Sequence, residues 1–423
     1  MKFGDLASPC GKGDAKGATE QGVTDTSIRI GYGDDRGFAG APGLEQDAGD
    51  AVKAMIQWCN DQGGINGRKI TGDYYDAAIT QTNNVMQKAC KADFMLVGQA
   101  FAGDEAAEAA RVNCKLVSVP TYAVGPDVAN APMYYSAVPN PVDQQPASGF
   151  AQLLKLQPGL KDGFGYIDSP LPAVTATIAK VKVAAAAAGY KVLDCGVSIS
   201  NQGEPSYAPF VNKFKSCGAK VIYVPFNPSP VVFNFIASMN QANVKATYLS
   251  QANGYAAYFA QANKAGLYND FYVQMPFQLL ENAADDPATK AYLDAVAKVK
   301  GTTGLLGMQA TSSFLLWATA AKDCGSTLTR QCMVNKLSAV HDWTAGGLNG
   351  KTDPGANKAT TCGLLAKLDG TKWVQAYPKE NATIECQDSY AVEIPKSAQL
   401  GVTLNSDRIA TKFLTSSVIK PQN

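Results

Sequence analysis

The residue types that most often carry out catalysis are scarce in this sequence of 423 residues. Its single histidine, His341, lies beside Asp342 and Trp343 and has no second histidine with which to hold a metal. An exposed serine nucleophile would need Gly-x-Ser-x-Gly, and a phosphate-binding loop would need G-x-x-x-x-G-K-[ST]; neither pattern occurs. We therefore interpret His341 as a structural or surface residue, and predict a protein that is not an enzyme and has neither a cofactor nor a metal.

One glycine-rich turn comes close to a nucleotide-binding pattern. Gly31-x-Gly33-x-x-x-Gly37 follows the first expected strand but misses the dinucleotide spacing by one residue. The next helix begins late, near Leu44, so its N-terminus is poorly placed for a pyrophosphate. Asp34, Asp35 and Arg36 within this turn are expected to be solvated; the functional alternative places one of them at the rim of a ligand site.

Residues suited to holding a small molecule follow four of the expected strands. Each set combines an aromatic or small apolar residue with an amide or a hydroxyl, which is the usual composition of a small-molecule site. The same residue types are favoured in ordinary turns, but four such sets at equivalent positions favour a binding site. The candidate ligand-binding residues are Gln99, Phe101, Ala102, Thr121, Tyr122, Ala123, Phe226, Asn227, Gln251 and Asn253.

Ten cysteines indicate the cellular compartment. Their number is even, they fall in near-neighbour pairs, and no CxxC motif occurs. Ten buried thiols in a cytosolic protein are the alternative, but the even count and the local pairing favour disulfides, and hence an exported protein. The predicted disulfides are Cys10–Cys59, Cys90–Cys114, Cys195–Cys217, Cys324–Cys332 and Cys362–Cys386.

Strands and helices that alternate along the chain would position these residues. Residues 28–32 alternate as a first strand, and apolar residues recur at helical spacing from Ala48 to Cys59. Gly63-Gly64 ends that helix, because glycine accepts the left-handed conformation, and residues 66–67 turn the chain into a strand at 70–76. Alternating units of this kind predict parallel sheets covered by helices, with ligands bound outside the carboxyl ends of the strands.

The same alternation continues to residue 377. Further strands are expected at 94–98, 115–119, 133–138, 164–168, 191–195, 219–225, 246–250, 271–275, 362–368 and 372–377. Further helices are expected at 80–90, 105–112, 174–188, 207–216, 231–242, 287–300, 309–323 and 329–337.

The order of strand, long loop, helix, GGINGRK (residues 63–69) and acid-ended strand resembles the start of a known family. That family is the leucine/isoleucine/valine-binding proteins, the type I periplasmic solute-binding proteins of ABC importers, and the resemblance extends to about Pro395. It implies an α/β fold with two Rossmann-like lobes, each with a parallel central sheet, joined by crossover strands. The implied domains are an N-terminal arm at 1–23, lobe one at 24–141 plus 276–342, lobe two at 142–275 plus 343–395, and a C-terminal extension at 396–423.

The resemblance also implies where the ligand binds and shows a departure there. In amino-acid binders a serine after the third strand holds the carboxylate, and the matching residue here is Ala102. An acid in lobe two holds the ammonium, and the matching residue is Asn253, or Ala252 if the register slips by one. A buried ammonium without a carboxylate is costly. We therefore expect a neutral or anionic solute with an apolar or aromatic part, rather than a standard branched-chain amino acid. The rings that would contact this solute, with lobe core as the alternative, belong to Phe101, Tyr122 and Phe226.

Composition agrees with an exported binding protein. With 46% hydrophobic residues the chain has enough apolar side chains for two cores, and a net charge of +1 implies no attraction to nucleic acid or to a membrane surface. We expect a monomer that captures its solute between two lobes and delivers it to the membrane subunits of an ABC transporter of the branched-chain amino acid type. It would be periplasmic or anchored at the outer face of the cell membrane. The alternative function is the ligand-binding sensory module of a receptor, which uses the same fold.

Overall fold

The computed structural model describes residues 1–422 and divides the chain into two compact units. Unit 1 comprises Met1–Val142, Asp286–Ala359 and Val402–Asn423, and unit 2 comprises Asp143–Asp285 and Thr360–Gly401. Each unit is a sheet covered by helices, so the predicted α/β fold class is confirmed.

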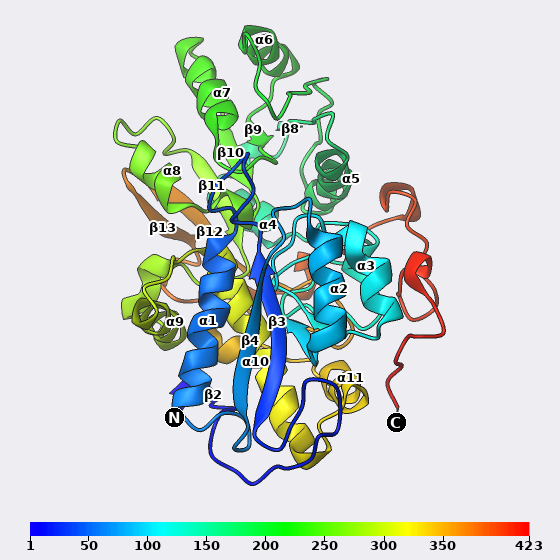
Figure 1. The fold of residues 1–423 in the computed structure, drawn as a ribbon. Helices are drawn as coiled ribbons and strands as arrows, with labels where there is room; N and C mark the ends of the chain where they lie inside the picture. The colour runs from blue at the N-terminus through cyan, green and yellow to red at the C-terminus, as the bar shows by residue number, and fades with distance from the viewer. Residues whose placement is uncertain (423) are drawn as a thin grey trace. The chain divides into compact units, whose positions relative to one another are not determined.

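The sheet of unit 1 has four parallel strands in the order β4-β3-β5-β6, and Figure 1 shows β3 and β4 side by side. In β3, Ile28 and Ile30 are fully buried, which matches the period of two that the sequence shows. Because the strands are parallel, their carboxyl ends meet at one edge of the sheet. The strands are β3 (Ser27–Asp34), β4 (Lys69–Asp76), β5 (Met95–Val97) and β6 (Ser118–Val119).

Helix α1 (Gln46–Asp61) and a glycine turn connect β3 to β4. The turn contains Gly64, which has a left-handed φ of 81° and donates its N–H to the Cys59 carbonyl at 3.0 Å. A Cβ atom at Gly64 would lie 2.0 Å from the Arg68 carbonyl oxygen. The turn therefore needs glycine for both its conformation and its space.

The remaining helices of unit 1 build its core. Helices α2 (Thr82–Ala92) and α3 (Asp104–Asn113) share an apolar cluster with Leu96 of β5. Helix α10 (Leu305–Cys324) is almost entirely buried, packs against α1, and passes behind β3 and β4 in Figure 1. Helices α9 (Pro287–Lys298) and α11 (Arg330–Ser338) pack beside α10.

The sheet of unit 2 is mixed, because an antiparallel hairpin extends four parallel strands. Gly370 at the tip of the hairpin has a φ of 53°, as the Asp369-Gly370 turn pattern predicts. The parallel strands are β8 (Phe164–Tyr166), β9 (Val221–Tyr223), β10 (Thr247–Ser250) and β11 (Phe271–Met275). The hairpin is β12 (Cys362–Asp369) and β13 (Lys372–Tyr377), and β14 (Glu385–Cys386) pairs with β12. A separate antiparallel pair joins β7 (Gln144–Pro146) and β15 (Ala391–Glu393).

Helices also supply the core of unit 2. Helices α4 (Ser148–Leu156) and α5 (Pro172–Ala187) pack apolar side chains, among them Phe150 and Val181, against the strands. Helices α6 (Ala208–Cys217), α7 (Pro230–Gln241) and α8 (Ala257–Ala262) contribute aromatic rings. Phe259 of α8 lies edge-on to Phe271 of β11 with ring centroids 4.8 Å apart, a favoured aromatic geometry.

All five predicted disulfides are present. They are Cys10–Cys59, Cys90–Cys114, Cys195–Cys217, Cys324–Cys332 and Cys362–Cys386, and no free cysteine occurs among residues 1–422. Each bridge joins two segments of one unit.

Two expected strands do not form. Over residues 133–138 only Tyr134 bridges to Ser118, because Met133 has a left-handed φ of 55° that interrupts the extended chain. Over residues 191–195 only Val192 bridges to Phe164; Gly196, with a φ of 61°, interrupts the extended chain before the pairing resumes with a bridge between Ser198 and Asp168.

The unit boundaries also differ from the expected domains, and the expected N-terminal arm is part of unit 1. Residues 276–285 belong to unit 2, whereas residues 343–359 and the tail from Val402 belong to unit 1. Side-chain hydrogen bonds attach residues 343–359 to unit 1. The Trp343 indole donates to Ser312 of α10 at 3.0 Å, and Thr352 donates to the Ala137 carbonyl at 2.7 Å. The tail pairs with unit 1 through the Ala410 N–H, which donates to the Asn130 carbonyl at 2.8 Å.

Candidate ligand-binding site

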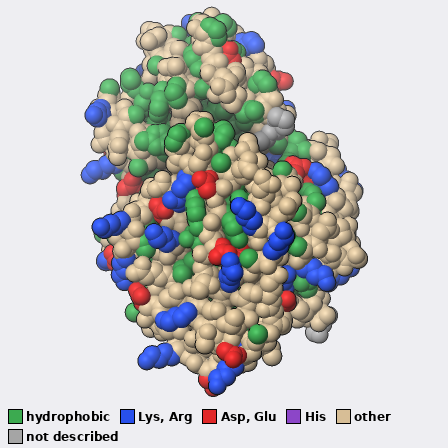
Figure 2. Space-filling view, viewed as in Figure 1, with side chains coloured by type: hydrophobic (Ala, Val, Ile, Leu, Met, Phe, Trp, Pro, Cys, Tyr) green, Lys and Arg blue, Asp and Glu red, His purple; other side chains and the backbone are tan. Residues whose placement is uncertain are grey.

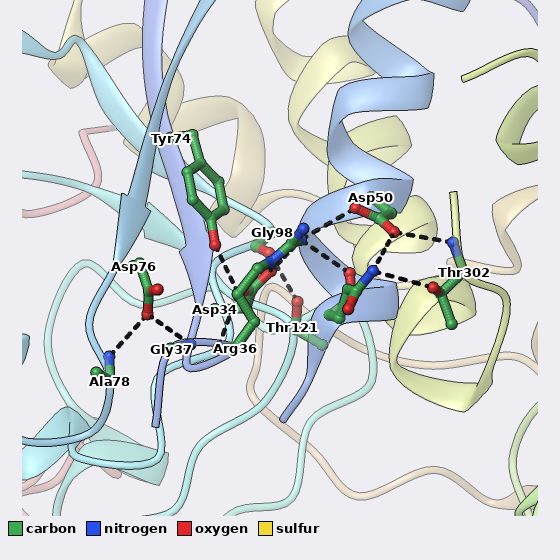
Figure 3. A network of polar contacts seen from close by, with 11 residues as sticks. Asp34, Arg36, Gly37, Asp50, Tyr74, Asp76, Ala78, Gly98, Thr121 and Thr302 are labelled. Carbon is green, nitrogen blue, oxygen red and sulfur yellow. Dashed lines mark hydrogen bonds and ion pairs between the residues drawn. The ribbon is translucent and has the colours of Figure 1, made fainter. Parts of the chain in front are cut away.

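The loop after β3 is anchored by a buried ion-pair network rather than solvated (Figure 3). The carboxylate of Asp34 accepts hydrogen bonds from the Arg36 guanidinium at 2.6 and 2.9 Å and from the Tyr74 hydroxyl at 2.8 Å. Arg36 also donates to Asp50 of α1 at 3.0 Å, and Asp50 accepts the Thr302 N–H at 2.8 Å. The expectation of a solvated turn was wrong, because these partners satisfy a carboxylate that is fully buried.

Asp35 is also fully buried, and it joins three loops at the carboxyl edge of this sheet. One carboxylate oxygen accepts the backbone N–H of Ile79 at 2.6 Å, and the other accepts the backbone N–H of Ala102 at 2.7 Å. Asp76 plays a similar part at an exposed position, since it accepts the N–H groups of Gly37 and Ala78 at 3.1 Å each. The predicted site residue Ala102 therefore has its N–H already bonded.

Three predicted site residues of unit 1 are buried inside it. Phe101 packs against Ala77 and Val85, so its ring belongs to the core of the unit, the alternative that the sequence left open. Gln99 donates to the Ser118 hydroxyl, and Thr121 donates to the Gly98 carbonyl at 2.9 Å. These contacts shape the loops after β5 and β6 from within.

The other three predicted residues of unit 1, Ala102, Tyr122 and Ala123, remain partly exposed. The Tyr122 hydroxyl donates to the carboxyl group of Glu45, the residue directly before α1. Burial raises the pKa of Glu45 to about 8, and the neighbouring Asp35 adds to this rise while the Tyr122 hydrogen bond opposes it. The Glu45 carboxyl group is therefore mostly protonated at neutral pH. Sequence reasoning missed Glu45, whose only local signal is an acid at the start of a helix.

In unit 2 the predicted residues follow β9 and β10. The amide of Asn253 donates to the Asn227 side-chain oxygen at 2.8 Å, and both residues are exposed. Gln251 is partly exposed, whereas Phe226 is 9% exposed, so only part of its ring is available to a ligand. The structure thus brings an amide pair and one aromatic ring together at the carboxyl edge of this sheet.

A second aromatic residue near this edge was missed by the sequence analysis. Tyr258 of α8 is 54% exposed, and its hydroxyl donates to the Pro228 carbonyl at 2.7 Å, next to Asn227. Figure 2 shows hydrophobic side chains gathered over the part of unit 2 that contains α8. A short helix of Ala, Gln and aromatic residues gives no sequence signal that separates such a ring from a core ring.

His341 is exposed and hydrogen-bonds Asp353 at 2.7 Å, far in sequence from every predicted site residue. No cluster of three or more His, Cys, Asp or Glu residues suited to a metal occurs within residues 1–422. Over the same residues, we find no helix with the length and apolarity needed to cross a membrane.

Comparison with known proteins identifies the family. Residues 27–372 match the sequence model of the periplasmic binding proteins. The chain belongs to the periplasmic binding protein family. This confirms the family that the sequence resembles, places the chain among binding proteins rather than enzymes, and implies a location outside the cytoplasm.

Solved structures of periplasmic binding proteins share the fold at low sequence identity. A fatty acid ABC transporter substrate-binding protein from Thermomonospora curvata is 14% identical, with a TM-score of 0.69, over 91% of this chain and 99% of that chain. A solute binding protein of an ABC transporter from R. palustris, in complex with 4-hydroxybenzoate, is 15% identical with a TM-score of 0.65, over 87% and 98%. The substrate binding protein LivJ from Streptococcus pneumoniae, in complex with isoleucine, is 14% identical with a TM-score of 0.63, over 83% and 100%. No curated protein sequence matches the chain.

Proposed function

We propose that this periplasmic binding protein is the solute-binding component of an ABC importer and delivers a small molecule to the membrane subunits of that transporter. Its family and the ABC transporter proteins that share its fold support this role. The ligand would contact the loops after the strands of each sheet, where Ala102, Tyr122, Ala123, Asn227, Gln251 and Asn253 are at least partly exposed.

The observation that carries the ligand assignment is the amide pair Asn227–Asn253. In an amino-acid binder the ammonium of the ligand needs a buried acid, and this pair offers only neutral donors and acceptors. In unit 1 the hydroxyl of Tyr122, a partly exposed candidate, is bonded to Glu45, whose pKa is raised by burial to about 8. We therefore propose a solute with uncharged polar groups and an aromatic or other apolar part, and not leucine, isoleucine or valine.

Isothermal titration of the full chain tests this assignment. The panel would contain the three branched-chain amino acids, aromatic amides, aromatic alcohols and small polyols. We expect Tyr122→Ala and Phe226→Ala to weaken binding of an aromatic solute at least tenfold. Asn240→Ala serves as a control for Asn253→Ala, because Asn240 is an exposed amide on α7 that donates only to the Leu267 carbonyl.

One result would contradict the ligand class. Sub-micromolar binding of leucine that is lost in Asn253→Ala but kept in Phe226→Ala would show an amino-acid site.

A receptor sensory module would bind its ligand in the same way, so the discriminating observation is the gene context: neighbouring genes for transporter membrane subunits favour the importer.

A further inference from the structure

We propose that Asp35 is a specificity-determining residue that excludes solutes presenting a carboxylate to unit 1. This inference rests on the proposed solute-binding function and gives a second reason, in unit 1, for a solute without a carboxylate group. It revises the expectation from sequence, which admitted anionic solutes.

Two backbone N–H groups from different loops converge on the side chain of Asp35. The Asp35 carboxylate spans two loops, with one oxygen 2.6 Å from the Ile79 nitrogen and the other 2.7 Å from the Ala102 nitrogen. Two backbone N–H groups that converge on one carboxylate form an anion site. In this protein the anion is a side chain of the protein itself, so the site is filled before any solute arrives.

The Asp35 carboxylate lies next to the backbone N–H of a predicted ligand-binding residue, Ala102. Ala102 is one of the partly exposed residues that the proposed function places at the ligand, whereas Asp35, which accepts its N–H, is fully buried. A solute carboxylate approaching Ala102 would find its N–H donor occupied and a second carboxylate behind it. Like charges in a poorly solvated site repel each other strongly.

The charged groups in the loop around Asp35 include more carboxylates than cations. Arg36, the cation in the same loop, is held by two carboxylates, those of Asp34 and Asp50, at 2.6 and 3.0 Å. Glu45 is neutral or negative, depending on whether it is protonated. It lies close enough to Asp35 for the two carboxyl groups to interact. The surroundings of Asp35 therefore remain negative and disfavour a solute anion.

The Asp35 carboxylate also holds the backbone of Ile79 in an unfavourable conformation. Ile79 has a left-handed φ of 58°, which is unfavourable for a β-branched residue, and its N–H is held by Asp35. A purely structural role for Asp35 would explain this contact as well. The test therefore needs a measurement that a structural role would leave unchanged.

The first experiment measures the charge preference. Benzoate, benzamide and benzylamine share one ring and differ in charge, and their affinities would be measured by titration calorimetry with wild type, Asp35→Asn and Asp76→Asn. Asp76 is the matched control, because its carboxylate also accepts two backbone N–H groups, those of Gly37 and Ala78 rather than that of Ala102. We expect wild type to prefer benzamide to benzoate, and Asp35→Asn to raise the ratio of benzoate to benzamide affinity at least tenfold, with no change in Asp76→Asn. A wild type that prefers benzoate, or an unchanged ratio in Asp35→Asn, would overturn the inference.

The second experiment needs no solute. In Asp35→Ala the two N–H groups lose their acceptor, and added sodium formate should restore it. We expect formate, compared with sodium chloride, to raise the unfolding temperature of Asp35→Ala by several degrees, or its refolding yield if the variant is unfolded, but not that of wild type or Asp294→Ala, since Asp294 pairs with the Lys290 ammonium rather than with backbone N–H groups. An equal response of all three proteins would overturn the proposed anion site. If formate rescues Asp35→Ala but wild type binds no solute at all, the solute-binding function fails and the anion site stands.

Discussion

The hydroxyl of Tyr122 donates to the carboxyl group of Glu45, which lies 77 residues earlier in the chain. This bond joins the loop after β6 to the start of α1, and it places a largely buried acid beside a predicted ligand-binding residue. Glu45 also has a left-handed φ of 62°, an uncommon conformation for this residue type. Such features gather at sites that the surrounding structure holds in place for function.

The stability of the protein should depend on pH through Glu45. Its pKa rises from the ordinary 4.5 to about 8 on folding, so the folded protein binds more protons than the unfolded chain between these values. This contribution is fully present below about pH 4.5 and is lost as the pH rises to about 8, at roughly 1.4 kcal/mol per unit of pKa difference at most. Urea unfolding at pH 5, 6.5 and 8 should show Glu45→Gln gaining stability relative to wild type as the pH rises.

The matched control is Glu281→Gln in unit 2. Glu281 accepts a hydrogen bond from the Tyr255 hydroxyl at 2.5 Å, so the same change is made in another tyrosine–glutamate pair. The stability difference between this variant and wild type should stay constant over the same pH range. A constant difference for Glu45→Gln as well would refute the proposed proton on Glu45.

The Arg36 network should contribute strongly to stability. Arg36→Gln leaves the fully buried Asp34 without its cation, and removal of one partner of a buried pair costs about 3–5 kcal/mol. Lys290→Gln is the control, because Lys290 pairs with Asp294 at 2.7 Å at the surface, with both side chains more than 60% exposed, and such pairs contribute about 1 kcal/mol or less. Equal losses in the free energy of unfolding from urea titration would contradict the account.

The glycine turn after α1 should tolerate no side chain. Gly64→Ala places a Cβ atom 2.0 Å from the Arg68 carbonyl oxygen in a left-handed conformation, so we expect a loss of about 2 kcal/mol or more. Gly159→Ala is the matched substitution, since nothing lies within 4 Å of its Cβ position, and its effect should stay within about 0.5 kcal/mol. Thermal unfolding of both variants measures the difference.

The disulfides should rank by the length of chain they close. Cys10–Cys59 spans 49 residues and Cys324–Cys332 spans 8, so loop-closure entropy favours the first by about 1.5 kcal/mol. Replacing each pair by alanine and measuring the free energy of unfolding tests this ranking. Peptide mapping without reduction should recover all five pairs, and a crossed pair would contradict the fold.

Local patterns in the sequence account for much of the fold. The alternation of Ile28 and Ile30, the helical spacing from Val52 to Cys59 and the glycines at 63 and 64 each fix a nearby backbone conformation, and the structure has the expected elements there. The cysteine pairs could be predicted because their partners lie at the ends of neighbouring elements.

The remaining features depend on distant partners. Nothing near Asp35 in sequence reveals that it accepts N–H groups from residues 79 and 102, and nothing near Tyr122 reveals Glu45. Phe101 and Tyr122 are both aromatic residues after a strand, yet one belongs to the core and the other is partly exposed. Composition cannot separate these cases, because burial is decided by the packing of α2 against β4.

Native mass spectrometry of the chain, purified without refolding, tests the central claim most directly. The account predicts that a fraction of the protein carries one small molecule, which dissociates on mild denaturation. This molecule should lack a carboxylate group, and the protein should release it chemically unchanged. A protein that retains no solute after purification and captures none from a cell extract would contradict the solute-binding function, as would a chemically altered solute.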